Sequence, residues 1–135
     1  MASRHQKQIL FVEDDADTLD ATAAMLERLG YSVKAETEGL KALRTFSEEP
    51  DRFDLALLDY GMPDVTGLEI AQRMGHIRPG FPVVFYTGYL DGPSTEELEA
   101  AGIGGRIVIK PATRKELTDV IQEALHEWAR SKTQP

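Results

Sequence analysis

Five short apolar runs recur along this chain of 135 residues, and their spacing constrains the fold more than any other feature. The runs begin about two dozen residues apart, and the segments between them have helix-like sequence. Strands that alternate with helices in this way predict βα units and a parallel sheet, which is the α/β class. The predicted strands cover residues 9–12, 31–35, 55–58, 83–86 and 107–109.

The last of five predicted helices has the clearest pattern. Its apolar residues recur three and four positions apart from Leu117 to Trp128, which predicts one buried face with Trp128 in the core or at its rim. Thr113 is a suitable N-cap, and Glu116, three residues later, completes a capping box. Gly30 is expected to end the first helix. The four earlier helices are predicted at about 17–29, 38–47, 67–74 and 94–101.

The polarity of the strands predicts their places in the sheet. Four runs are apolar throughout, as expected for strands covered by helices on both faces, whereas the run that starts at Tyr31 mixes polar and apolar residues and is expected at an edge. The length fits one domain, expected at 8–130, between frayed tails at 1–7 and 131–135.

Composition excludes several classes of function. The chain has no cysteine, so it has neither disulfides nor thiolate metal sites and suits a reducing cytoplasm. Its net charge of −8 argues against a nucleic-acid surface, which needs clustered Lys and Arg. It has no apolar run of transmembrane length and no secretion signal at its start. We therefore expect a cytoplasmic protein without membrane or nucleic-acid partners.

Polar residues follow each of the four apolar strands. Ligands of open parallel sheets bind outside the carboxyl ends of the strands, so these residues predict one shared pocket. Each residue alone has an ordinary explanation, such as helix capping, turn formation or a solvated amine, but four such coincidences at one edge are improbable. In chain order the residues are Glu13, Asp14, Asp15, Asp59, Thr87 and Lys110.

The charges of this pocket indicate its chemistry. If Asp14 and Asp59 face each other at about 5 Å, their repulsion costs about 3 kcal/mol at an effective dielectric near 20. Lys110 and a hard divalent cation are the two partners that relieve it, and oxygen ligands without His or Cys favour Mg²⁺, or Mn²⁺. With its charge screened, Asp59 is able to act as a nucleophile and form an acyl phosphate. Thr87 and Lys110 would then donate to the phosphoryl oxygens.

Several of these stretches resemble response-regulator receiver domains of two-component signalling. Residues 9–15 are similar to the first strand and acidic pocket of the family, and residues 59–67 match its phosphoacceptor motif, an Asp followed by Met-Pro and then Gly. The segments 82–88 and 109–111 match its Thr strand and its Lys-Pro strand, and the similarity covers about residues 8–128. The resemblance implies a doubly wound, flavodoxin-like sheet of five strands in the order 2-1-3-4-5, with five helices.

The resemblance also implies roles for individual residues. Asp59 would be the phosphoacceptor, Asp14 a direct Mg²⁺ ligand and Glu13 a ligand mostly through water, while the backbone carbonyl of Gly61 would complete the protein ligands. Asp15 falls outside this metal set and is interpreted as a helix-start residue. The family further implies a cis peptide bond between Lys110 and the following proline.

The partners follow from the same resemblance. A histidine kinase or a histidine phosphotransfer protein would donate the phosphoryl group, and the output would pass through protein contacts to an unidentified partner. The chain would act as a stand-alone regulator or as the receiver of a hybrid kinase, and as a monomer or weak dimer. Such a domain is a signalling phosphoacceptor that catalyses only its own phosphorylation and dephosphorylation.

Two other functions are considered and discounted. A Mg²⁺-dependent aspartyl-phosphate phosphatase of the haloacid-dehalogenase type needs a second Asp two positions after its nucleophile, where this chain has Gly61. A flavin- or nucleotide-binding module of the same topology needs a Gly-rich phosphate loop after the first strand, where this chain has carboxylates.

The chain departs from the family at the positions associated with output. Ile107 occupies the place of an aromatic residue whose rotation reports phosphorylation in many receivers, and Ala112 replaces a common Phe. Since Ile has few χ1 states, we expect the signal to leave the pocket through Thr87 and the segment that carries Tyr89.

Overall fold

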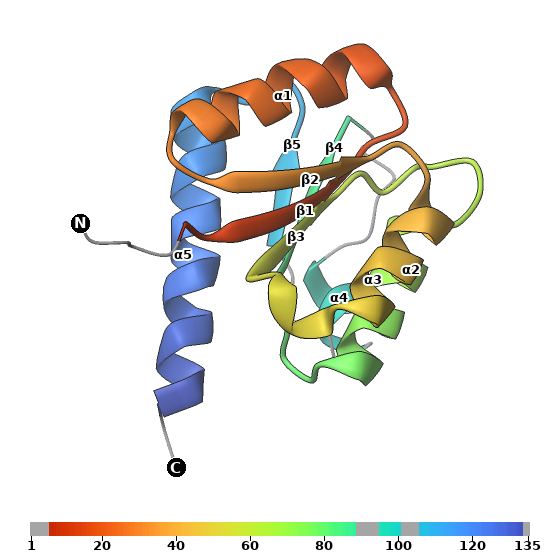
Figure 1. Cartoon of the computed structure of the whole chain (residues 1–135), viewed down its shortest axis with the longest axis vertical. Coiled ribbons are helices and arrows are strands. Elements are labelled where there is room, and N and C mark those ends of the chain that lie inside the picture. Colours follow the sequence, from red (N-terminus) through yellow and green to blue (C-terminus); the bar gives the residue numbers. More distant parts are fainter. Residues whose placement is uncertain (1–5, 89–94, 101–105, 134–135) are drawn as a thin grey trace.

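A five-stranded parallel sheet forms the centre of the protein (Figure 1). The computed structural model describes residues 6–88, 95–100 and 106–133. Its strand order is β2-β1-β3-β4-β5, and every neighbouring pair is parallel, so the predicted α/β class and strand order are confirmed. The strands are β1 (Gln8–Val12), β2 (Ser32–Glu36), β3 (Leu55–Leu58), β4 (Val83–Thr87) and β5 (Arg106–Ile109).

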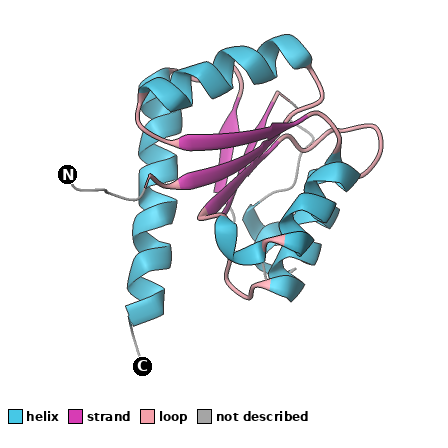
Figure 2. Ribbon diagram, in the orientation of Figure 1, coloured by secondary structure: helices cyan, strands magenta, loops and turns pink. Residues whose placement is uncertain are grey.

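Helices cover both faces of this sheet (Figure 2). On one face lie α1 (Ala16–Arg28) and α5 (Arg114–Thr133); on the other lie α2 (Gly39–Glu48), α3 (Gly67–Ile77) and α4 (Thr95–Ala100). A 3₁₀ turn that we did not predict, η1 (Pro50–Arg52), links α2 to β3. The five predicted helices are therefore confirmed, although α3 continues three residues past its expected end.

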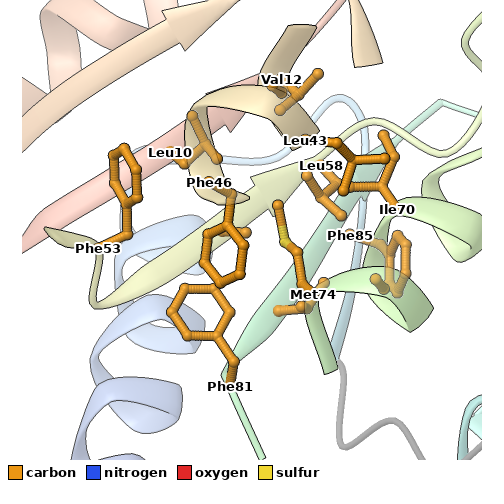
Figure 3. Close-up of a cluster of buried hydrophobic side chains, with 14 of the residues drawn as sticks. Leu10, Val12, Leu43, Phe46, Phe53, Leu58, Ile70, Met74, Phe81 and Phe85 are labelled. Atoms are coloured by element: carbon orange, nitrogen blue, oxygen red, sulfur yellow. The ribbon is translucent and has the colours of Figure 1, made fainter. Parts of the chain in front are cut away.

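Alternation along the strands divides the core into two clusters. Ile9 and Phe11 pack beneath α1 and α5, whereas Leu10 and Val12 pack beneath α2 and α3. The second cluster contains Phe46 of α2 and Phe81, whose rings lie next to each other with their centroids 4.9 Å apart (Figure 3), and Met74 of α3. Each fully buried side chain of this size stabilises the fold by about 1.5–3 kcal/mol, so the two layers fix the sheet between them.

Local signals define the ends of α1. The Asp15 side chain accepts a hydrogen bond from the Thr18 backbone N–H (3.0 Å), which confirms Asp15 as the residue that starts this helix. Gly30 adopts a φ of 101° just after the last turn, a conformation that a residue with a Cβ rarely takes. The predicted stop at Gly30 is thus confirmed.

Capping boxes begin two further helices. At α5, the Glu116 N–H donates to Thr113 Oγ1 (3.0 Å) and the Thr113 N–H donates to Glu116 Oε1 (2.8 Å), as predicted. At α3, Thr66 and Glu69 form a second box that we did not predict, although its Thr-x-x-Glu spacing is visible in the sequence. This box fixes the entry to α3 directly after the segment that follows β3.

Three expectations about the edges of the fold differ from the structure. β5 lies at an edge of the sheet, as the predicted order requires, but only Val108 of this strand is buried and Ile109 is 43% exposed, so the prediction that all four apolar strands are fully covered was wrong. β1 begins at Gln8, one residue before its predicted start, and α5 continues to Thr133, into the segment expected to fray.

Within the described residues, no helix combines the length and apolarity needed to span a membrane.

Candidate functional site

The predicted site residues lie where the sheet ladder ends. Backbone hydrogen bonds continue one residue past the strands, so each of the residues that follow is held by its neighbour across the sheet. These bonds run from Glu13 N–H to Glu36 O (3.0 Å), from Asp59 N–H to Val12 O (2.9 Å) and from Lys110 N–H to Thr87 O (2.8 Å). The site is therefore built on rigid backbone at the carboxyl edge of the sheet.

Three carboxylates meet at this edge. One oxygen each of Glu13, Asp14 and Asp59 lies within 4.8 Å of the other two. Glu13 and Asp59 are buried, whereas Asp14 is exposed to solvent. Asp15 is not part of this group, because its side chain caps α1. The structure thus brings together the three acids expected to form the pocket.

Lys110 provides the positive charge beside these acids. Its ammonium group forms an ion pair with Glu13 and lies 4.0 Å from Oδ2 of Asp59. The same nitrogen lies 5.2 Å from the centroid of the Tyr86 ring, at the distance of a cation–π contact. The Lys110–Pro111 peptide bond is cis, as predicted. We had not singled out Tyr86, although its place directly before Thr87 puts it at the same strand end.

Both oxygens of Glu13 are engaged. Oε1 accepts from Lys110, and Oε2 accepts from the Asp15 backbone N–H at 3.1 Å. Burial raises the pKa of Glu13, and the nearby Asp59 charge raises it further. The hydrogen bonds from Lys110 and Asp15 oppose this change without cancelling it, so the pKa lies above its ordinary value of 4.5. A second positive charge at this site would favour the ionised form.

Within the described part of the chain, Asp59 contributes a buried oxygen that is not satisfied. Its Oδ1 is buried and has no hydrogen-bond partner among the described residues. Leaving such an oxygen unpaired away from water costs roughly 1–3 kcal/mol, more for a charged group. Oxygen donors with no His or Cys among them suit a hard cation, and Mg²⁺ is commonly held by one or two carboxylates and waters. The residues present therefore fit Mg²⁺.

The remaining predicted residues are placed around this group. Thr87 is buried at the end of β4, and Gly61 is half-buried in the segment between β3 and α3. Ile107 is half-buried and packs against the core cluster beneath α2 and α3. Tyr89 lies outside the described residues, so its expected part in signal output stays a prediction.

Comparison with known families agrees with this geometry. Residues 9–122 match the family described as the response regulator receiver domain. The chain belongs to this family. It is accordingly a two-component signalling domain, a phosphoacceptor rather than a conventional enzyme, with an acidic pocket consistent with Mg²⁺-dependent phosphorylation of an aspartate.

This receiver matches nearly the whole length of one curated relative and a small part of another. It is 32% identical over 119 residues to the response regulator receiver protein CpdR of Brucella abortus, covering 88% of this chain and 97% of CpdR. It is 33% identical over 129 residues to the CAI-1 autoinducer sensor kinase/phosphatase CqsS of Vibrio cholerae, covering 93% of this chain but only 18% of CqsS. It also spans less than a third of several other curated relatives.

Solved structures include similar receivers. A CheY-like receiver domain protein from Methanospirillum hungatei has a TM-score of 0.82 and 32% identity, covering 94% of this chain and 99% of that one. The receiver domain of the sensor histidine kinase PA1611 from Pseudomonas aeruginosa has a TM-score of 0.77 and 26% identity, covering 90% of this chain and 99% of that one. That structure has a magnesium ion coordinated in its active-site cleft.

Proposed function

We propose that this receiver accepts a phosphoryl group from a phosphohistidine donor onto Asp59, in a reaction that requires Mg²⁺. The observation that carries the proposal is Oδ1 of Asp59, a buried carboxylate oxygen without a hydrogen-bond partner among the described residues, beside two further carboxylates. Such an oxygen is ready to bind a cation or attack an electrophile, because no hydrogen bond has to be broken first.

Glu13, Asp14 and Asp59 would hold the cation, together with the backbone carbonyl of Gly61. When bound, Mg²⁺ neutralises the acids and lets the anionic phosphoryl group approach. Backbone hydrogen bonds across the sheet hold the main chain of Glu13 and Asp59, so these two acids project from fixed positions. The magnesium ion in the PA1611 receiver supports this assignment.

In the transfer step, an oxygen of Asp59 forms a bond to phosphorus as the phosphorus–nitrogen bond of the donor breaks. The bonding electron pair leaves with the donor imidazole, whose other ring nitrogen carries the proton that keeps it neutral. Thr87 donates its hydroxyl hydrogen to a phosphoryl oxygen. Lys110, which already lies 4.0 Å from Asp59, turns from Glu13 to the phosphoryl group and balances its charge.

The donor in this proposal is a histidine kinase or a histidine phosphotransfer protein, as expected for a two-component receiver. The output passes through contacts with another protein, and the receiver acts as a monomer or weak dimer. Its coverage of nearly all of CpdR supports a stand-alone regulator, whereas its match to one part of CqsS supports a receiver within a larger kinase.

Incubation with acetyl phosphate and Mg²⁺, followed by intact mass spectrometry, tests the proposal. The wild-type chain should gain the mass of one phosphoryl group and Asp59→Asn should gain none, because Asn keeps the shape and lacks the nucleophile. Asp54→Asn is the matched control at the other end of β3 and should react like the wild type. A mass gain that persists in Asp59→Asn would move the acceptor to another residue, with Asp14 tested next. Steady hydrolysis of phosphoesters would favour the phosphatase instead.

A further inference from the structure

The N-terminus of α2 is capped by a residue from another part of the chain. Its own N-cap residue, Glu38, makes no side-chain capping hydrogen bond. Instead, Oδ2 of Asp64 accepts from the Leu40 backbone N–H at 3.0 Å. Asp64 belongs to the segment that joins Asp59 to α3, so this hydrogen bond ties the phosphoacceptor segment to a helix that precedes it by 24 positions in sequence.

Packing brings the same two segments into direct contact. A Cβ on Gly39, the first residue of α2, would lie 2.5 Å from Cγ1 of Val65 and 2.9 Å from Cδ1 of Ile70. Real Cβ atoms are not found at such distances, so glycine permits this close approach. Val65 and Met62 are both buried in the core cluster beneath α2 and α3. The segment therefore sits directly on the first turn of α2.

The charge state of Asp64 agrees with its role as a cap. Desolvation raises its pKa, but hydrogen bonds from the backbone N–H groups of Leu40 and Gly39, its own N–H and that of Val65 outweigh this effect. The pKa of Asp64 is therefore lowered from its ordinary value of 3.8. At neutral pH the carboxylate is ionised and able to accept from α2.

The two ends of the segment, at Asp59 and at Gly67, are held next to each other by different contacts. The Gly67 N–H donates to the Tyr60 carbonyl at 3.0 Å, and a Cβ on Gly67 would lie 2.8 Å from the Asp59 carbonyl oxygen. Among the side chains between these two ends, Met62 and Val65 contribute apolar burial and Asp64 contributes the hydrogen bond to α2. Gly61 lies within this stretch, between Tyr60, which is held by Gly67, and the residues that pack on α2.

We infer that Asp64 is a positioning residue for the cation site: its hydrogen bond to α2 holds the segment that carries Gly61, so that the Gly61 carbonyl joins the carboxylates without having to be ordered first. The inference rests on the proposed function, in which that carbonyl is a ligand. A segment that moves freely loses conformational entropy when a cation orders it, and a contact that orders it beforehand removes this loss from the binding equilibrium.

Mg²⁺ titration of the full chain, followed by calorimetry or backbone amide NMR, tests the role of Asp64. Asp64→Ala should weaken Mg²⁺ binding about fivefold, the ratio that corresponds to the typical contribution of a capping residue. Asp64→Asn should bind nearly like the wild type, because its side-chain carbonyl still accepts from Leu40. Gly39→Ala disturbs the same contact from the α2 side, through its clash with Val65, and should also weaken binding.

Asp54→Ala is the matched control, because Asp54 Oδ2 accepts from the Gln8 backbone N–H at 2.8 Å at the opposite edge of the sheet. It removes the same kind of hydrogen bond and should lower stability without changing Mg²⁺ affinity. Wild-type affinity in Asp64→Ala, or equal weakening in Asp54→Ala, would reduce Asp64 to a structural residue and overturn the inference. Asp14→Ala separates the two proposals: if it binds Mg²⁺ like the wild type, the proposed cation site itself is wrong.

Discussion

The ammonium group of Lys110 pairs with the buried carboxylate of Glu13 and lies 4.0 Å from Oδ2 of Asp59. One lysine, whose side chain is 22% exposed, therefore faces two buried acids. The proposed phosphoryl ligand is thus already within the site, paired with Glu13.

Lys110→Met should destabilise the metal-free protein by about 2–3 kcal/mol, because removal of one partner leaves a buried charge uncompensated. Urea unfolding in EDTA measures this effect, and saturating Mg²⁺ should restore much of the loss by replacing the missing charge. Lys115→Met, which removes an exposed pair with Asp119, is the control and should leave stability nearly unchanged. Equal stability of Lys110→Met and wild type in EDTA would mean that the lysine does not compensate these acids.

Asp14→Ala should weaken Mg²⁺ binding by about tenfold or more, since it removes a carboxylate from the cluster. In EDTA its stability should rise, but by less than about 1 kcal/mol, because Asp14 is exposed and solvent screens its repulsion with Asp59. Mg²⁺ titration and thermal melts in EDTA measure the two effects. Asp17→Ala, an exposed acid of α1 outside the cluster, should leave Mg²⁺ affinity unchanged. A lower melting temperature for Asp14→Ala would contradict the expected repulsion.

The stability contributed by Asp64 should depend on pH with a definite sign. Because the folded-state pKa lies below the ordinary value of 3.8, the contribution is fully present above 3.8 and is lost as the pH falls through the lower folded value. The stability difference between wild type and Asp64→Asn should therefore be constant above about pH 5 and shrink in more acidic solution. Unfolding in EDTA between about pH 3 and pH 6 measures it. A difference that grows on acidification would show that the carboxylate is not the favoured form.

Trp128→Ala should lower the stability of the protein without changing its phosphorylation. The indole packs edge-on against Phe81, with centroids 6.2 Å apart, and the Arg78 guanidinium carbon lies 5.2 Å from its ring centroid. These contacts lie before the start of β4, at the edge opposite the acidic pocket. The substitution should lower the free energy of unfolding by about 2–3 kcal/mol, and Trp128→Phe by less. Phosphorylation by acetyl phosphate should be unchanged while the protein is folded; its loss would mean that the two edges are coupled.

The sheet and its site-bearing edge were predictable from the sequence, because parallel strands place distant residues at the same edge. Apolar runs locate the strands, and residues at their carboxyl ends must share one edge whatever the details of packing, so the Glu13, Asp14 and Asp59 cluster was predictable. The partners of individual side chains were not. The pairing of Lys110 with Glu13 depends on the rotamer of a long flexible chain, and the cap that Asp64 provides depends on how two loops approach. The exposure of Ile109 in β5 was not predictable either, because an apolar run does not reveal which of its side chains the helices cover.

Gly67 has no functional group, yet it stands where a side chain cannot be added. A Cβ there would meet the Asp59 carbonyl oxygen at 2.8 Å and the Tyr60 Cα at 3.0 Å, and both are backbone atoms that have no rotamer through which to move aside. Any substitution must therefore shift the backbone of Asp59 and Tyr60. A saturation mutagenesis screen for loss of signalling should accordingly recover nearly every replacement at position 67, so that in a mutational profile this glycine would look as intolerant as Asp59.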